Sequence, residues 1–391
     1  GVFLDQVEVA MVTMRALPVS SAPALTAAKL KFFALSVDAD NVGLVGVPEI
    51  ALSANNLEVR LNQGSFDSTW PGIAGVNAPP VVDFALSFPD DSWDPTNPDT
   101  DTLPDGYLVQ VSTTGPPTAL TWDQPIIGVS ADNVLLRISS FVYVSGSFSF
   151  NKGPIKMVDV RTGLTELQAD IPLVGVDESA TDPGTSLARK SDGSIVWNLP
   201  VETLELGLSG VDVFVGYTNS LDAAAADGNL TTAELNAAGA TGFALDNVNL
   251  GMVMMRALPI SSAPALTAAK LKFFAVQADA DNLGLVGVPG IEMTAAIAEV
   301  QVNHGSFDIW PSVQGVNPPP VVDFALSFPD DSWGSTADAD TAADGYHVAT
   351  NTSGAFIPLL FDHPLIGGGA DQVNITISEF VHLSGSIYFE Q

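Results

Sequence analysis

The sequence predicts an all-β protein: an elongated tandem-repeat array of long, mainly antiparallel strands in stacked, sandwich-like sheets, with a β-solenoid as the alternative. The first observation behind this prediction is a long alternation of apolar and polar residues, which is the pattern of a strand with one buried and one wet face. Residues 133–150 and 372–389 both show it, and each run is much longer than the roughly 5–6 residues of an ordinary strand. In the second run the apolar positions are Val373, Ile375, Ile377, Val381, Leu383, Ile387 and Phe389.

The second observation is an internal repeat. Residues 14–34 return as residues 255–275 with a single Val-to-Ile change, and residues 81–93 return unchanged as 321–333. Residues 1–152 therefore align with 242–391, and we call them copy 1 and copy 2. Residues 153–241 occur once and are called the connector. Because both ends of the chain fall at interior points of the alignment, we expect a window on a longer array whose like units stack.

The third observation is the scarcity of helix signals. The alanines and Pro23 of residues 20–29 permit one short helical turn or only a loop. In the connector, further strands lead to one candidate helix over residues 231–238, after the N-cap-like Asn229. A loop rich in Pro and Gly is expected over 64–80 and an acidic loop over 89–105. The strands expected in copy 1 cover residues 3–17, 30–47, 50–61, 81–88 and 121–150.

Composition excludes several classes of function. The 391 residues carry 13 Lys plus Arg against 45 Asp plus Glu, a formal charge of −32, which repels a phosphate backbone and excludes nucleic acid as a partner. The absence of cysteine excludes disulfides, thiol catalysis and zinc–thiolate sites. No apolar run reaches the roughly 18 residues that a membrane span needs. Because the chain opens at Gly1 without Met or a signal sequence, we expect it to be processed or cut from a longer protein.

Several motifs together resemble a known group of proteins. They are D-N-V-N-L-G-M-V-M-M, L-V-G-V-P-G-I, F-V-Y-V-S-G-S-F-S-F-N-K-G, and V-D-V-F-V-G-Y followed by D-G-N-L. The chain resembles, over nearly its whole length, the repeats of very large secreted or surface bacterial proteins of the RTX-type, calcium-binding, adhesin-like group. The resemblance implies a secreted, extracellular protein at the cell surface or in a biofilm matrix, with many repeats and Ca²⁺ dependence. It supplies no catalytic motif and no ligand.

A degenerate calcium loop is one candidate metal site. An EF-hand loop needs oxygen ligands at positions 1, 3 and 5, Gly at 6 and Glu at 12. With Gly228 at position 6, Ala223 and Ala225 occupy positions 1 and 3 and provide no ligand. A surface turn that leads into a short helix is the alternative. The candidate ligands in this segment are Asp222, Asp227, Asn229 and Glu234.

Two further acidic groups recur in both copies. The first has alternate Asp residues that can share a cation, although an Asx-rich turn between strands has the same sequence; it comprises Asp38, Asp40, Asn41, Asp279, Asp281 and Asn282. The second is the acidic loop, where a solvated loop is the alternative to Ca²⁺ binding; its candidates are Asp90, Asp91, Asp101, Asp105, Asp330, Asp331, Asp340 and Asp344.

Four loop tryptophans are candidate ligand contacts, because Trp is enriched at binding hot spots. They can stack on a sugar or a neighbouring subunit, or fold back onto the sheet; they are Trp70, Trp93, Trp310 and Trp333. Catalysis is not expected. The four histidines are matched in copy 1 by other residues, and no hydrolase, metalloprotease or nucleotide-binding motif is present.

These observations predict a structural rather than an enzymatic role. We expect a repeat segment of an extracellular fibre, stalk or matrix filament, stabilised by Ca²⁺. Neighbouring copies of the same protein are the expected partners, joined head to tail or laterally through strand edges. The alternative is an adhesin module that binds glycan or surface ligands through the acidic and Trp-bearing loops.

Overall fold

The computed structural model describes residues 1–66, 80–93, 103–139, 141–164, 186–190, 192–218, 230–260, 262–309, 319–333 and 341–391. The predicted all-β class is confirmed, and so are the long antiparallel strands. Thirteen strands form one large sheet, and two further hairpins lie beside it. None of the helices in these ranges is long and apolar enough to cross a lipid bilayer.

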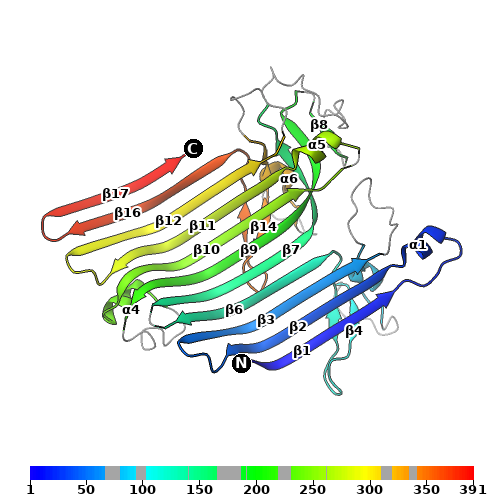
Figure 1. Cartoon of the computed structure of the whole chain (residues 1–391), viewed down its shortest axis with the longest axis horizontal. Helices are drawn as coiled ribbons and strands as arrows, with labels where there is room; N and C mark the ends of the chain where they lie inside the picture. The colour runs from blue at the N-terminus through cyan, green and yellow to red at the C-terminus, as the bar shows by residue number, and fades with distance from the viewer. Residues whose placement is uncertain are drawn as a thin grey trace.

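Eleven of the thirteen strands are long, and each of these is hydrogen-bonded to the next long strand along the chain (Figure 1). The pairing of all neighbours in this path is antiparallel. The first and last strands therefore lie at opposite edges. In spatial order the strands are β1 (Val2–Arg15), β2 (Lys31–Leu44), β3 (Ile50–Ser65), β6 (Ile126–Ile138), β7 (Val142–Arg161), β9 (Ile195–Tyr217), β10 (Thr241–Ala257), β11 (Lys272–Val286), β12 (Ile291–Ser306), β16 (Leu365–Ile377) and β17 (Val381–Glu390). The two short strands, β8 (Ala188–Arg189) and β13 (Val321–Val322), pair with β9 and β7.

β-Bulges interrupt most of these long ladders near their middle, where an extra residue on one strand increases the local twist. The pairings of β3 with β6, β9 with β10 and β12 with β16 all shift register there. Asn56, Asn133 and Asn247 have φ of 50°, 46° and 54° at such places. Asn tolerates this left-handed conformation better than most residues because its short polar side chain bonds locally.

Each copy carries an insertion between its third and fourth long strands. The insertion of copy 1 holds α2 (Phe84–Ser87) and the hairpin of β4 (Tyr107–Val109) with β5 (Thr118–Leu120). The insertion of copy 2 holds β13 (Val321–Val322), α6 (Phe324–Ser327) and the hairpin of β14 (Tyr346–Ala349) with β15 (Phe356–Leu359).

The predicted strand over residues 81–88 is wrong, because α2 occupies residues 84–87 and no residue of this range lies in a strand. The carboxylate of Asp83 accepts a hydrogen bond from the backbone N–H of Leu86 at 2.7 Å and so caps the first turn. This N-cap fixes a helical start in a run that is apolar enough to be read as a strand. In copy 2, Asp323 caps α6 in the same way.

The short helices between strands follow local signals. α1 (Pro23–Ala28) confirms the predicted helical turn, and α5 (Pro264–Ala269) repeats it in copy 2. α4 (Thr232–Ala237) confirms the connector helix, but its N-cap is Thr231 and not Asn229. Thr231 and Glu234 form a capping box, in which each side chain bonds the backbone of the other residue.

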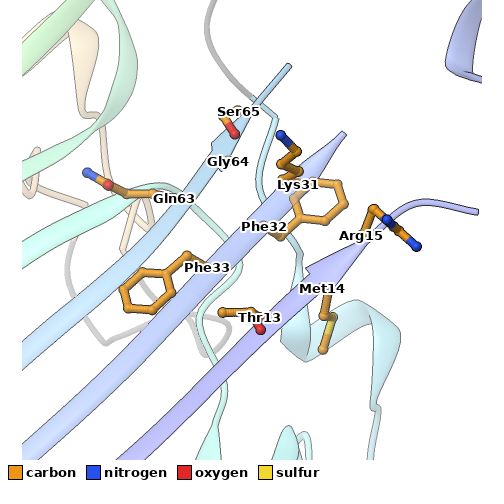
Figure 2. Close-up of a pocket in the computed structure, with 9 residues that line it drawn as sticks. All are labelled: Thr13, Met14, Arg15, Lys31, Phe32, Phe33, Gln63, Gly64 and Ser65. Atoms are coloured by element: carbon orange, nitrogen blue, oxygen red, sulfur yellow. The ribbon is translucent and has the colours of Figure 1, made fainter. Parts of the chain in front are cut away.

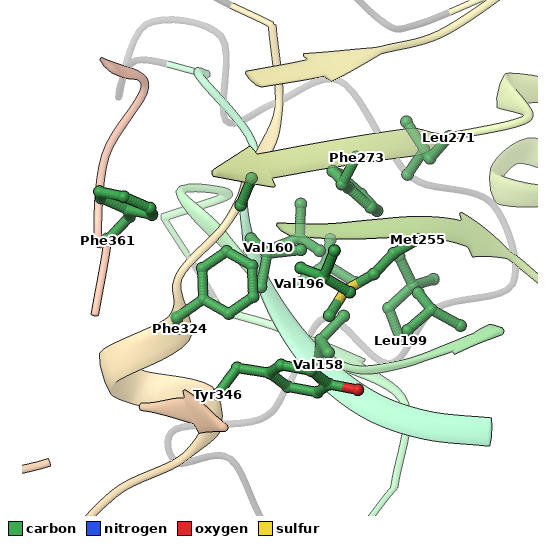
Figure 3. Packing of buried hydrophobic residues seen from close by; sticks show 14 of the residues in the cluster. Val158, Val160, Val196, Leu199, Met255, Leu271, Phe273, Phe324, Tyr346 and Phe361 are labelled. Carbon is green, nitrogen blue, oxygen red and sulfur yellow. The ribbon is translucent and has the colours of Figure 1, made fainter. Parts of the chain in front are cut away.

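The core joins the segments that the repeat defines. The largest cluster of buried side chains combines Val158, Val160 and Leu199 of the connector with Met255 and Phe324 of copy 2 (Figure 3). A second cluster, called the bridging cluster below, takes side chains from copy 1, connector and copy 2. It comprises Tyr143, Phe214, Leu230, Leu235, Ala240, Ala244 and Val286.

The repeat boundaries lie inside strands. Copy 1 ends within β7 and copy 2 begins at the second residue of β10. Residues 1–152, 153–241 and 242–391 thus share one sheet and are not separated by a linker. A third cluster, around Ala10, Ala34, Phe84 and Leu120, packs the insertion of copy 1 onto its own strands.

Candidate functional site

The two edge strands of the sheet are the first candidate for a functional surface. Within the described ranges, no strand pairs with the outer side of β1 or of β17. An edge of this kind presents a row of unpaired backbone donors and acceptors, which is a template for another strand. The edge of β1 also exposes apolar side chains, since Val7, Val9 and Met11 are 41%, 49% and 57% exposed.

Both edge strands have a covered counterpart inside the same chain. β10 is the counterpart of β1, and β9 pairs with its outer side from Thr241 to Ala257. β7 is the counterpart of β17, and β9 pairs with it as well. Tyr143 on β7 lies opposite Phe214 on β9 and is buried, whereas His382 holds the same place on β17 and is exposed. One strand of the connector therefore covers the two edges that the copies otherwise present.

The insertion of copy 2 also rests on the connector. Val321 and Val322 of β13 pair with Arg161 and Val160 at the end of β7, and both valines are fully buried. The guanidinium of Arg161 lies 2.8 Å from the buried carboxylate of Asp323. Ladder hydrogen bonds and an ion pair thus hold the insertion in place.

A buried polar group strengthens this junction. The hydroxyl of Tyr346 on β14 donates a hydrogen bond to the carboxylate of Glu205 on β9, and the hydroxyl of Thr203 donates to the same carboxylate at 3.3 Å. Burial raises the pKa of Glu205, while the Tyr346 hydrogen bond and the Lys156 ammonium oppose that shift. Burial lowers the pKa of Lys156, whose Nζ lies 4.5 Å from the centroid of the Trp333 ring.

In copy 1, no described residue of the connector is hydrogen-bonded to the counterparts of these insertion residues. Val81, Val82 and Tyr107 are counterparts of Val321, Val322 and Tyr346, yet all three are only half-buried. Among the described residues, none accepts a hydrogen bond from the Tyr107 hydroxyl. The insertion of copy 1 therefore has the same surface that binds the connector in copy 2, but no described connector residue is bound to it.

The first group of calcium candidates lies on strands, with three residues in β2 and three in β11. Asp38 accepts a hydrogen bond from Ser36 at 3.2 Å, and it lies between Glu8 on β1 and Glu58 on β3. Burial is the main cause that raises the pKa of Asp38 and of Glu58. In copy 2, Asp279 and Asp281 accept hydrogen bonds from Asn249 and Asn247 at 3.1 and 2.8 Å.

In the acidic loops, the described aspartates accept hydrogen bonds from neighbouring residues of the loop. Asp105 accepts hydrogen bonds from Ser92 Oγ at 3.2 Å and from the N–H of Trp93 at 3.3 Å, and Asp344 accepts from the N–H of Ser332 at 2.9 Å. The candidates Asp90, Asp91, Asp330 and Asp331 lie in the turns after α2 and α6. Asp101 and Asp340 lie outside the described residues.

The degenerate calcium loop is only partly placed. Asp222, Asp227 and Asn229 lie outside the described residues, and Glu234 uses its carboxylate in the capping box of α4. In the parts of the chain that the structure describes, no three His, Asp or Glu side chains come together in a group that could hold a metal ion.

Sequence reasoning missed a polar groove of about 870 Å³ across β9 to β16, lined by Asp212, Asp246, Asn247, Asp281 and Asn374 among others. Its carboxylates already bind protein donors. Asp212 accepts from the N–H groups of Asn247 and Leu230 at 2.9 and 3.1 Å, and Asp246 accepts from Thr232. These bonds fasten the α4 segment onto the sheet.

Two of the four candidate tryptophans lie in the described residues, and both pack against aromatic side chains of their own insertion. Trp93 stacks on Phe88 at 5.5 Å between ring centroids, and its indole N–H donates to the carbonyl of Gly106 at 2.8 Å. Trp333 stacks on Phe328 at 5.7 Å and on His347 at 4.9 Å. Trp70 and Trp310 lie outside the described residues.

The residues that hold the connector in place, Glu205, Tyr346, Lys156 and Arg161, were not found from the sequence. The only available signal was that Tyr107 and Tyr346 recur in the repeat. Comparison with family models, curated proteins and solved structures finds no match to this chain.

Proposed function

We propose that this chain is a structural repeat segment of an extracellular fibre, stalk or matrix filament, in which repeats join into one lengthening sheet. The observation that carries the proposal is the position of β9, which is hydrogen-bonded to copy 1 on one side and to copy 2 on the other. The bridging cluster buries side chains of all three segments at the same place. The interior therefore continues from one repeat to the next, as in proteins whose repeats stabilise their neighbours.

The acidic surface supports the extracellular and calcium-stabilised part of this proposal. A formal charge of −32 opposes the compact state through self-repulsion, and salt or divalent cations relieve that repulsion. The row of Glu8, Asp38 and Glu58 across three neighbouring strands concentrates the repulsion in one place. We expect Ca²⁺ to stabilise the protein more than Na⁺ at equal ionic strength.

The adhesin alternative receives less support. A sugar stacks on a free aromatic face, but Trp333 is stacked on both Phe328 and His347. Trp93 is 47% exposed, and its stacking on Phe88 and its indole hydrogen bond tie it to the insertion. Glycan-array binding that disappears in Trp93→Ala is the result that favours this alternative.

A lengthened chain tests the proposal. Residues 153–391 are appended after Gln391, which aligns with Lys152, so that a second connector and a third copy follow. Small-angle scattering is expected to show a longer particle, and thermal unfolding is expected to shift upward because each interior repeat gains neighbours. The proposal is contradicted if scattering shows separate folded units joined by flexible linkers and the melting temperature does not rise. Scans in CaCl₂, EDTA and NaCl of matched ionic strength test the Ca²⁺ part separately.

A further inference from the structure

We propose that the outer edge of β1 is the acceptor for a β9-type strand, meaning an antiparallel strand with the residue pattern of 201–217 supplied by another repeat. The inference rests on the proposed function, because it names which strand joins successive repeats and where. Its evidence is the contrast between β1, whose edge is open, and β10, whose edge β9 fills.

The pairing of β9 with β10 gives the register of the expected strand. Arg256 lies opposite Glu202, and their side chains form an ion pair. Arg15 holds the place of Arg256 in copy 1, and among the described residues it has no ion pair. A β9-type strand on β1 therefore sets an acidic residue opposite Arg15, and its next residues run along Met14 and Thr13.

A groove at the end of β1 marks the vacant position. It has a volume of about 550 Å³ and is lined by residues of β1, β2 and β3, including Met14, Arg15, Phe32 and Phe33 (Figure 2). The corresponding groove of copy 2 has the counterparts Met255, Arg256, Phe273 and Phe274, but Glu202, Thr203 and Leu204 of β9 complete its wall. Met255 and Phe273 are buried there, whereas Met14 and Phe32 are half-buried in copy 1. The missing element of the copy 1 groove is thus β9.

The insertion of copy 1 supplies a second contact. In copy 2 the strand β14 lies over both β10 and β9, and it brings the Tyr346 hydroxyl to Glu205. In copy 1 the corresponding strand β4 lies over β1. The Tyr107 hydroxyl on β4 is therefore placed to donate to the Glu205 position of an incoming strand.

Strand direction excludes β17 of a second copy as the strand on β1, and charge makes β17 a weaker acceptor than β1 for a β9-type strand. The path from β1 to β17 has eleven strands with antiparallel neighbours, so its two edge strands run in the same direction. A second copy placed head to tail with the same face up therefore brings β17 parallel to β1, whereas the covered counterparts both pair antiparallel with β9. On β17, Glu390 holds the place of Asn151, which lies opposite Glu205, so a β9-type strand meets like charges there.

A synthetic peptide of residues 200–217 tests the inference on the full chain, whose internal site is already filled by its own β9. We expect saturable one-to-one binding by fluorescence anisotropy, with hydrogen-exchange protection of the β1 amides and none of the β17 amides. Arg15→Glu is expected to weaken binding about fivefold, the upper range for an exposed ion pair. The peptide with Glu202→Arg is expected to restore the affinity of the Arg15→Glu chain. Lys270→Glu, an exposed site in copy 2 with the same charge change, serves as the matched control.

The inference is overturned by no binding, by equal protection of β17, or by equal weakening in the Arg15→Glu and Lys270→Glu chains. A second variant guards against self-association of the peptide. Residues 195–241 are placed directly before Gly1, which reproduces the natural junction with Gly242, and β1 must then gain exchange protection. If the lengthened chain described above elongates while both of these tests fail, the proposed function stands and this inference is rejected.

Discussion

The hydroxyl of Tyr346 donates a hydrogen bond to the half-buried carboxylate of Glu205, a residue 141 positions earlier in the sequence. The bond crosses from the insertion of copy 2 to the connector. Its counterpart in copy 1, Tyr107, has no such acceptor among the described residues. The two tyrosines therefore form a natural matched pair for measuring how strongly a connector binds a copy.

Removal of the Tyr346 hydroxyl is expected to destabilise the protein. In Tyr346→Phe the half-buried Glu205 carboxylate loses the Tyr346 donor, and a hydrogen bond to a charged group contributes about 2 kcal/mol. Tyr107→Phe is the control and is expected to change the free energy of unfolding little. Urea denaturation of both variants measures the difference. Equal losses in the two variants contradict a special role for the connector contact.

The bulge residue of β12 is expected to be a site of backbone strain. Ile297 has a φ of 61°, and Asn56 holds the same place in copy 1 with a φ of 50°. A β-branched residue in this conformation costs about 1–2 kcal/mol, whereas Asn tolerates it. Ile297 is also 53% exposed, so its replacement sacrifices little burial.

Ile297→Asn is therefore expected to stabilise the protein by about 1 kcal/mol, and Asn56→Ile to destabilise it by a similar amount. Thermal and urea unfolding of the two variants measure both shifts. A loss of stability in Ile297→Asn shows that side-chain contacts outweigh the backbone conformation at this bulge.

Truncation of Phe214 is expected to uncouple the copies. Phe214 is fully buried in the bridging cluster, and its removal leaves a cavity that costs about 3–5 kcal/mol. Calorimetry should then resolve separate transitions for copy 1 and copy 2, whereas the parent chain is expected to unfold in one coupled transition. Phe243→Ala, at a position 54% exposed, is the control and should leave the profile unchanged. A single unsplit transition in Phe214→Ala shows that the copies couple elsewhere.

The carboxylate row of copy 1 is expected to weaken the fold at neutral pH. The folded-state pKa of Asp38 is raised by burial first and by Glu8 in addition. A group with a raised folded pKa opposes folding when it is ionised, and this penalty disappears as the pH falls through the raised value towards the ordinary 3.8.

Asp38→Asn should therefore stabilise the protein at pH 7, with a gain that shrinks as the pH approaches 4. The exposed Asp40→Asn is the control for net charge. Melting temperatures across this pH range provide the measurement. A gain that grows on acidification has the wrong sign and contradicts the assignment.

Strand positions were predictable because apolar and polar residues alternate with a period of two along β7 and β17. The prediction that the apolar face of these strands is the buried one is wrong. In residues 142–150 of β7 the buried side chains are those of Tyr143, Ser145 and Ser149, and all residues of β17 are exposed.

The helix α2 was missed because four helical residues cannot show a 3.6-residue period. Its signal was Asp83, an N-cap residue three positions before Leu86. The capping box of Thr231 and Glu234 was also readable, since Thr-x-x-Glu is its usual pattern.

The contacts that join the copies were not predictable. Glu205 is one acidic residue among 45 Asp plus Glu, and nothing in its local sequence shows burial opposite Tyr346. Arg161 meets Asp323 only because β13 pairs with the end of β7. Such pairs depend on how an insertion folds back over the sheet, which is a long-range property.

The direction in which the strands add has a mechanical consequence. A tensile force along that direction acts parallel to the ladder hydrogen bonds, so all the bonds of one ladder share the load. The 23 residues of β9 pair with β7 on one side and with β10 on the other, so the joint between the copies distributes the load over two long ladders. When the proposed polymer is stretched, this β9 joint is therefore expected to rupture late.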